Sequence, residues 1–280
     1  MEWSRPARPP VCGMILELIE YLMTPCPAEV RSMGFLASSM QVRARARRCR
    51  RAWAPHLANT KRAVLGAVER CPRRRVCVVL GAGLLHDIPV RELSETFGKV
   101  VLVDVVHPWL SRLAVRRFRN VEQLAADATE VMEKVWTMHM APGGAFPESH
   151  PMRFMDAEDL DLTISVNLLS QLPYVPNKVL RGRCDDAALD AFLRHLVEAH
   201  LDYLARLPGH TALITDTAMR SLATEGGEEL ERADLLRGVA LPPPDAAWEW
   251  RIAPSPEVER GVDVVSDVVC HLDWKSAFRL

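Results

Sequence analysis

The fold of this chain is decided by the segment VCVVLGAGL at residues 76–84 and by VVLVD at residues 100–104. The first is an apolar, β-branched run that stops at Gly-Ala-Gly, and the second is an apolar run that stops at an acid. A strand of a parallel sheet is covered on both faces, so its sequence is continuously apolar. Glycines after such a strand permit a sharp turn and close approach to a ligand. We therefore predict the start of a doubly wound, nucleotide-binding sheet.

Strand-like and helix-like segments alternate from this point onward. The pattern predicts strands at 76–80, 100–104, 121–124, 161–167 and 211–215, and helices at 90–97, 109–118, 129–138 and 185–207. Two late strands are expected at 248–253 and 262–272, and the segment 217–245 has a mixed pattern. Strands alternating with helices indicate right-handed crossovers and a mainly parallel sheet, here of seven strands. The fold class is therefore α/β.

The first 70 residues have a different pattern, with no strand signal. Their spacing predicts helices at 11–23, 28–53 and 56–69. We expect an N-terminal helical cap over residues 1–72 and an α/β domain over residues 73–280.

The composition is that of an ordinary globular protein, with 280 residues, 49% hydrophobic and 25% charged. No apolar run reaches the roughly 18 residues that a bilayer span needs, and Glu17 and Glu20 interrupt the N-terminal apolar segment. The seven cysteines are scattered, without a CxxC pair, which argues against disulfides and a zinc site. We expect a cytoplasmic protein with no membrane segment and no metal.

Charge is distributed unevenly along the chain. Residues 1–75 carry fifteen Lys or Arg and five Asp or Glu, while the remainder carries twenty and thirty-one. Six arginines crowd into residues 43–51. They indicate a surface that binds an anionic or protein partner. The alternatives are a solvent-exposed face and a face that packs against the acidic part of the chain.

Acids follow the second and third predicted strands. Asp104 is placed to accept hydrogen bonds from two ribose hydroxyls, or it caps a helix or pairs with an arginine. Asp127 is placed to bind the exocyclic amine of a purine, or it is the N-cap of the following helix. A dinucleotide fingerprint needs a small residue where this chain has His86, which weighs against an NAD-linked oxidoreductase. A plain strand-to-helix turn is the remaining alternative.

The order Gly-Ala-Gly, Asp104, Asp127 and DLTISVNLLSQLP (residues 161–173) resembles class I S-adenosylmethionine-dependent methyltransferases over about residues 75–273. The resemblance implies an antiparallel C-terminal edge hairpin and S-adenosylmethionine as cofactor. It implies that the glycine loop binds the methionine part, that the two acids bind ribose and adenine, and that strand four faces the methyl group. The cofactor-binding residues would be Gly81, Ala82, Gly83, Leu84, Asp104, Val105, Asp127, Ala128, Asn167 and Leu168.

Three departures from the family pattern bear on function. The usual acid two residues before the first glycine is Val79, the frequent third glycine is Leu85, and the stretch 137–158 is an insertion. They support the alternative of a non-catalytic methyltransferase fold that serves as a binding or assembly partner. Strand four ends in Asn-Leu-Leu-Ser, so the Asn-Pro-Pro-Tyr signature of nucleic-acid enzymes is absent. We expect a small-molecule acceptor and no nucleic acid.

Methyl transfer from a sulfonium needs mainly alignment and a dry pocket. A general base is needed where the acceptor must lose a proton. No residue stands out for that role; the weak candidates in the sequence are His107, His56, His139, His150, Tyr174 and Gln171.

Overall fold

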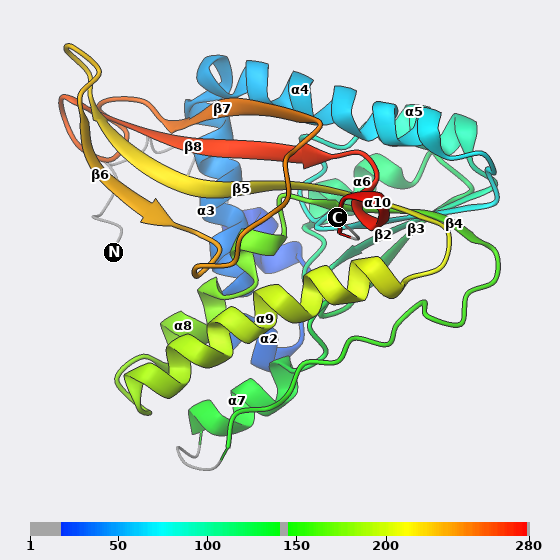
Figure 1. Cartoon of the computed structure of the whole chain (residues 1–280), viewed down its shortest axis with the longest axis horizontal. Coiled ribbons are helices and arrows are strands. Elements are labelled where there is room, and N and C mark those ends of the chain that lie inside the picture. The colour runs from blue at the N-terminus through cyan, green and yellow to red at the C-terminus, as the bar shows by residue number, and fades with distance from the viewer. Residues whose placement is uncertain (1–17, 141–144, 279–280) are drawn as a thin grey trace.

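A computed structural model describes residues 18–140 and 145–278 (Figure 1). Its centre is one sheet with the strand order β3-β2-β1-β4-β5-β8-β7, and β6 pairs with β5 outside this order. The strands are β1 (Val76–Leu80), β2 (Lys99–Asp104), β3 (Val121–Ala125), β4 (Leu160–Val166), β5 (His210–Ala223), β6 (Glu229–Asp234), β7 (Ala246–Ala253) and β8 (Val262–His271).

The first five strands in the chain form the parallel part of the sheet, and the last two form its antiparallel edge. Strands β3, β2, β1, β4 and β5 pair in parallel with their neighbours. Strand β8 lies between β5 and β7 and is antiparallel to both. The predicted doubly wound sheet with an antiparallel C-terminal hairpin is confirmed.

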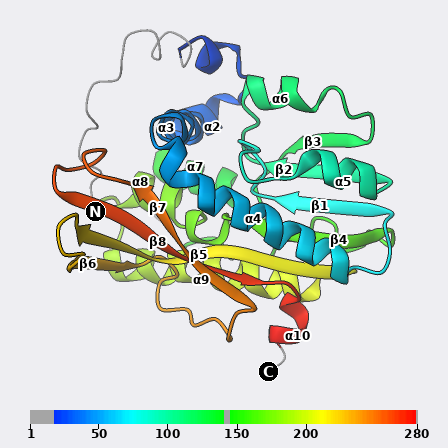
Figure 2. The same ribbon diagram turned by 90° about the horizontal axis from the view of Figure 1, so that it is seen from above.

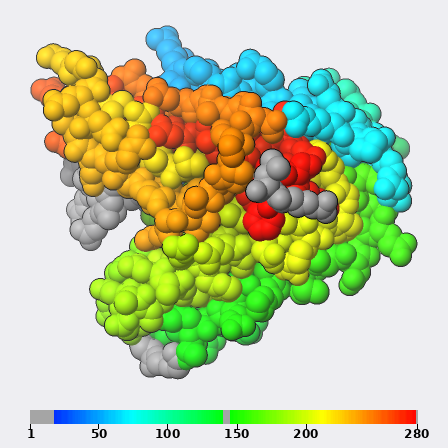
Figure 3. Space-filling model, in the orientation of Figure 1, coloured from blue at the N-terminus to red at the C-terminus, as the bar shows by residue number. Residues whose placement is uncertain are grey.

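The seven predicted strands are all present, and the described part of the sheet has an eighth strand, β6, that was not predicted. Strand β5 continues to Ala223, and the chain turns through Gly226 and Gly227 and returns as β6. The sequence of β6 is ELERAD, and all its residues but one are exposed. A strand without a buried face has no apolar alternation, which is why the pattern of 217–245 did not reveal it. Figure 3 shows this extension as the yellow and orange lobe standing apart from the green surface of α8 and α9.

The described helices begin with residues 18–23. They continue with α2 (Ala28–Ser32), α3 (Phe35–Arg48), α4 (Arg50–Arg70), α5 (Val90–Thr96), α6 (Trp109–Val115), α7 (Met132–Met140), η1 (Leu169–Gln171), α8 (Tyr174–Leu180), α9 (Asp186–Arg206) and α10 (Trp274–Phe278). The first seventeen residues, including most of the helix predicted at 11–23, lie outside the described residues.

The single helix predicted over 28–53 is wrong. Gly34 separates α2 from α3 with a left-handed φ of +92°, and Cys49 separates α3 from α4. Helix α4 then runs through Pro55, which lies between the helices predicted at 28–53 and 56–69. The third helix therefore begins at Arg50 rather than at His56.

Alternate side chains of β1 enter two different cores. Cys77 and Val79 pack with α4 and α5, whereas Val78 and Leu80 pack with α9 and α10. Figure 2 shows α4 crossing one face of the sheet, with α9 beyond the other. Helix α4 thus shares its core with β1, while the boundary at residue 72 stays a prediction about independent folding.

Two arginines of the run at residues 43–51 contact Glu257, between β7 and β8 of the C-terminal hairpin. Arg48 donates to both carboxylate oxygens of Glu257, and Arg45 lies 3.5 Å from the same group. Arg43 pairs with Glu20 at 3.2 Å. These contacts agree with the docked alternative for part of the run. Within the described residues, no helix combines the length and hydropathy that crossing a bilayer requires.

Candidate functional site

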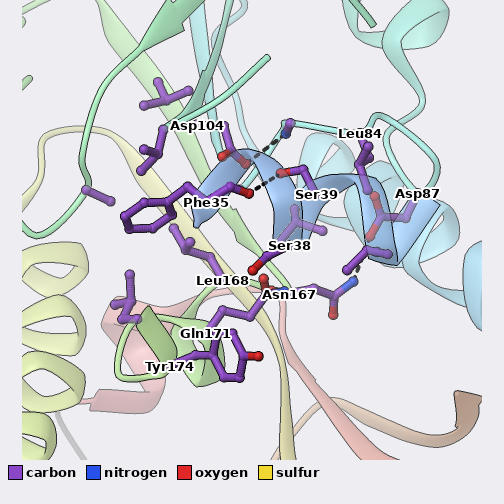
Figure 4. A pocket seen from close by; sticks show the side chains of 18 of the residues that line it. Phe35, Ser38, Ser39, Leu84, Asp87, Asp104, Asn167, Leu168, Gln171 and Tyr174 are labelled. Atoms are coloured by element: carbon purple, nitrogen blue, oxygen red, sulfur yellow. Dashed lines mark hydrogen bonds between the residues drawn. The ribbon is translucent and has the colours of Figure 1, made fainter. Parts of the chain in front are cut away.

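A cleft opens at the carboxyl ends of β1, β2 and β4 (Figure 4). This is the edge of a doubly wound sheet at which ligands bind. Its walls come from the turns after β1 to β4 and from α3, α4, α8 and β7. All of the predicted cofactor-binding residues line it except Ala82, whose side chain is buried in the core.

Both glycines after β1 are required by close contacts. Gly81 has φ +87°, and a Cβ atom there would lie 2.4 Å from the carbonyl oxygen of Val166. At Gly83 a Cβ atom would meet the Asp104 carboxylate at 2.8 Å. The backbone therefore passes closer to β2 and β4 than any side chain allows.

Leu85 occupies the position at which the family often has a third glycine. Its φ is +63°, in the left-handed region that disfavours residues with a Cβ atom. The turn therefore keeps a glycine-like backbone although the glycine is missing. A residue with a Cβ atom in this region carries backbone strain that a glycine would not.

Asp104 is held at the tip of β2 by backbone donors. Its Oδ2 accepts from the Gly83 amide at 2.9 Å, and its Oδ1 accepts from the Val106 amide at 3.3 Å. Burial raises the pKa of Asp104 to about 6, against the opposing effect of these amides. An ionised carboxylate has about four acceptor positions, so two remain for ligand hydroxyls.

Asp127 also lines the cleft, and its carboxylate caps the entry to α7. It accepts from the amide and hydroxyl of Thr129 and from the amides of Val131 and Met132, at 2.7 to 2.9 Å. This is the capping role left open by the sequence, and it uses the acceptor positions of the carboxylate. The contact with adenine stays a prediction.

His56 is buried in the cleft wall between α4 and β7. Its ring stacks on Trp250 with centroids 4.1 Å apart, and Trp248 Nε1 donates to its Nδ1 over 3.1 Å. Burial lowers the pKa of His56 to about 3, so the ring is neutral. A neutral ring that accepts at Nδ1 carries its proton on Nε2. Nε2 lies 3.4 Å from the side-chain nitrogen of Asn167.

Asp87 is a cleft residue to which the sequence analysis gave no role. Its Oδ2 accepts from Asn167 Nδ2 over 2.7 Å, a contact drawn in Figure 4. Burial raises the pKa of Asp87. An acid four residues after the second glycine was the available signal, but nothing in the sequence showed that the loop folds back onto β4.

The other candidate bases divide into two groups. Tyr174 and Gln171 line the cleft, and Gln171 donates to the backbone oxygen of Asn167. His107 lies outside the lining and contacts the carbonyl oxygen of Leu124 at 3.0 Å. His139 and His150 are also outside it.

Formal charge in the cleft wall is negative. The described lining contains Asp87, Asp104 and Asp127 and neither lysine nor arginine. Burial lowers the pKa of His86 to about 4, as it lowers that of His56, so neither ring supplies a positive charge near neutral pH. Among the described residues, no cluster of three potential metal ligands occurs.

Helix α3 and the aromatic side chains of the cleft were not predicted from the sequence. Phe35, Ser38 and Ser39 reach the cleft from α3, and Trp53 and Trp250 reach it from α4 and β7. Their spacing is that of ordinary helix and strand faces, so no local signal sets them apart.

No protein-family model matches this sequence, and no curated protein matches it. Among solved structures, a 1,6-didemethyltoxoflavin-N1-methyltransferase from Burkholderia thailandensis aligns over 96% of this chain and 94% of its own, at 14% identity and a TM-score of 0.38. The N-methyltransferase NodS from Bradyrhizobium japonicum aligns over 76% of this chain and 94% of its own, at 10% identity and a TM-score of 0.35. An rRNA methylase from Streptococcus thermophilus aligns over 73% of this chain and 92% of its own, at 13% identity and a TM-score of 0.28. Similarities at this level carry over neither an activity nor a substrate.

Proposed function

We propose that this chain binds S-adenosylmethionine in the cleft and transfers its methyl group to a small-molecule acceptor. The observation that carries the proposal is the unit formed by Gly81, Gly83 and Asp104. The glycines bring the backbone to the ligand, and the acid keeps two acceptor positions at the tip of β2. The adenosyl ribose would bind Asp104, and the methionine part would lie along the turn after Gly81.

The electrostatics of the cleft support a sulfonium cofactor over a dinucleotide. A pyrophosphate needs cations or a helix N-terminus to bind it. The described lining has three carboxylates and no lysine or arginine. A positively charged sulfonium is attracted by such a wall, whereas a pyrophosphate is repelled. This weighs against the NAD-linked alternative.

The walls of the cleft support a small acceptor. Helix α3 closes one side with Phe35 and Val42, and α8 closes another with Tyr174 and Val175. A site walled by several elements admits a small molecule more readily than a helical nucleic acid. The adenine would lie against Ala126, Ala128 and Met132, beside the loop that Asp127 holds in place.

Two alternatives remain distinct from catalysis. A non-catalytic methyltransferase fold would keep the binding site without turnover, and the positive φ of Leu85 and the buried Val79 are the features that favour it. A protein partner at the basic helices is less favoured at Arg45 and Arg48, which are engaged with Glu257.

Titration calorimetry with S-adenosylmethionine and S-adenosylhomocysteine, with NAD as the control, tests the proposal. Binding of the two adenosyl compounds in the micromolar range, without binding of NAD, is the expected result. Failure of both to bind would refute it. Binding without turnover across amine, hydroxyl and thiol acceptors would favour the non-catalytic alternative.

A further inference from the structure

Asp87 is a carboxylate in the cleft wall that has no counter-ion. Its single side-chain partner is the amide nitrogen of Asn167, and no ion pair in the described residues includes it. Lys61 of α4 is near enough to lower the pKa of Asp87, but burial outweighs that effect. Removing a carboxylate from water without pairing it costs free energy. A ligand that brings a positive charge would recover that cost.

Asn167 presents a second unfilled group in the same wall. Its side chain is 8% exposed, and its Oδ1 is buried without a hydrogen-bond partner in the described part of the chain. Its Nδ2 is already used by Asp87 (Figure 4). A buried carbonyl oxygen without a hydrogen-bond donor is rare in folded proteins, and a ligand could supply that donor. The Asp87 carboxylate thus lacks a counter-ion, and the adjacent Asn167 Oδ1 lacks a donor.

The chemistry of a fitting group follows from these two acceptors. It must carry positive charge for Asp87 and an N–H donor for Asn167. A sulfonium or quaternary ammonium has the charge and no donor, whereas a protonated primary or secondary amine has both. The neighbouring His56 is neutral and does not compete for the site.

We propose that Asp87 and Asn167 bind an ammonium group of a ligand in the cleft. The group has two possible sources, the amino group in the amino-acid part of the cofactor and the amine of an acceptor. The first source rests on the proposed function, while the second does not require it.

Calorimetry with two adenosyl ligands distinguishes the sources. S-adenosylhomocysteine has an amino-acid part, and 5′-methylthioadenosine lacks it. If the cofactor supplies the amine, Asp87→Asn should weaken the binding of S-adenosylhomocysteine by roughly 10- to 100-fold. The affinity for 5′-methylthioadenosine should stay unchanged. The control variant Glu95→Gln removes an exposed acid from α5 and should change neither of the two ligand affinities.

If an acceptor supplies the amine, both adenosyl affinities should survive Asp87→Asn. Wild-type protein should then bind butylamine in preference to butanol, detected by amide NMR shifts of cleft residues, and the variant should lose that preference. The smaller Asp87→Ser variant provides a second test, with thermal unfolding as the check on folding.

The outcomes separate the two hypotheses. Wild-type protein that binds neither adenosyl ligand refutes the proposed function, and the butylamine comparison still decides the role of Asp87. Unchanged S-adenosylhomocysteine affinity in Asp87→Asn, together with equal binding of butylamine and butanol by the wild type, would overturn the ammonium site.

Discussion

The Cα atom of Gly83 lies directly against the carboxylate of Asp104. A Cβ atom at position 83 would be 2.8 Å from Oδ2, the same oxygen that accepts from the Gly83 amide. Strands β1 and β2 pair in parallel with Leu80 opposite Val103, so the turn and the acid meet at one edge. The glycine turn and Asp104 are therefore one structural unit, and a change at either position affects the other.

Gly81→Ala should destabilise the protein by about 1–3 kcal/mol from backbone strain, with an added cost from its clash with Val166. The matched control is Gly182→Ala, which has φ +76° and open space around it. Urea unfolding of both variants measures the difference. Equal losses of unfolding free energy in the two variants would show that the clash with Val166 of β4 adds nothing to the backbone strain.

Asp104→Asn should weaken S-adenosylhomocysteine binding by about 1–3 kcal/mol, because a charged acceptor for the ribose hydroxyls is replaced by a neutral one. The amide is nearly the same shape, but its NH2 group replaces an oxygen that accepts from a backbone amide, so thermal unfolding is measured beside binding to check the turn. Calorimetry at neutral pH is the measurement, and unchanged affinity would count against the ribose assignment. Asp156→Asn, at an exposed position, serves as the control.

The same affinity should depend on pH. Burial raises the pKa of Asp104 to about 6, so its carboxylate takes up a proton as the pH falls through that value. Affinity should then decrease by up to about tenfold per pH unit below about pH 6, and Asp104→Asn should flatten the profile. The stability effect has the opposite direction. The cost of burying the ionised acid is present above about pH 6 and is relieved as the pH falls toward its ordinary value of 3.8.

His200 should make the fold sensitive to acid. Burial lowers its pKa to about 4, and its Nε2 lies 2.9 Å from the Ser165 hydroxyl in the core. The unfolded chain takes up this proton near 6.5, so the stability contribution is present above that value and is lost as the pH falls toward 4. The loss should be about 1.4 kcal/mol per pH unit.

Urea unfolding of wild type and His200→Gln across that range checks the loss. The stability gap between them should narrow as the pH decreases. His150→Gln, at an exposed ring, should leave the wild-type profile unchanged. A constant gap would contradict the neutral, buried state of His200.

Trp248 should fix the tautomer of His56. Its indole N–H donates to Nδ1, so ¹⁵N NMR should show a neutral ring protonated on Nε2. Trp248→Phe removes the donor and should give a mixture of tautomers. A proton on Nδ1 in the wild type would contradict the arrangement and restore His56 as a base at Nε2.

Much of the fold was predictable because buried parallel strands leave a continuous apolar signal. The runs at β1, β2 and β4 are of that kind, and their ends located the glycine turn, Asp104 and Asn167. The N-terminal helices were placed less well, since Pro55 lies inside α4 and the break at Gly34 depends on a single φ angle. Strand β6 has no apolar face to detect.

The candidate site was predictable only where local chemistry marks it. The glycine turn after β1 and Asp104 after β2 could be located because they follow the ends of apolar strands. Asp127 was located too, while its capping role stayed open. The pairing of Asp87 with Asn167 joins residues 80 apart in the chain, and that of His56 with Trp248 joins residues 192 apart. The first contact depends on how the loop after β1 folds back onto the end of β4, and the second on how α4 packs against β7; periodicity encodes neither.

The position of β8 between β5 and β7 has a consequence for synthesis on the ribosome. The wall around His56 comes from α4 and from β7, an edge strand whose strand partner in the described sheet is β8. Helix α4 leaves the ribosome long before either strand exists. Trp53 and His56 therefore stay uncovered by β7 until Trp248, 192 residues after His56, and the strand β8 beyond it have been translated.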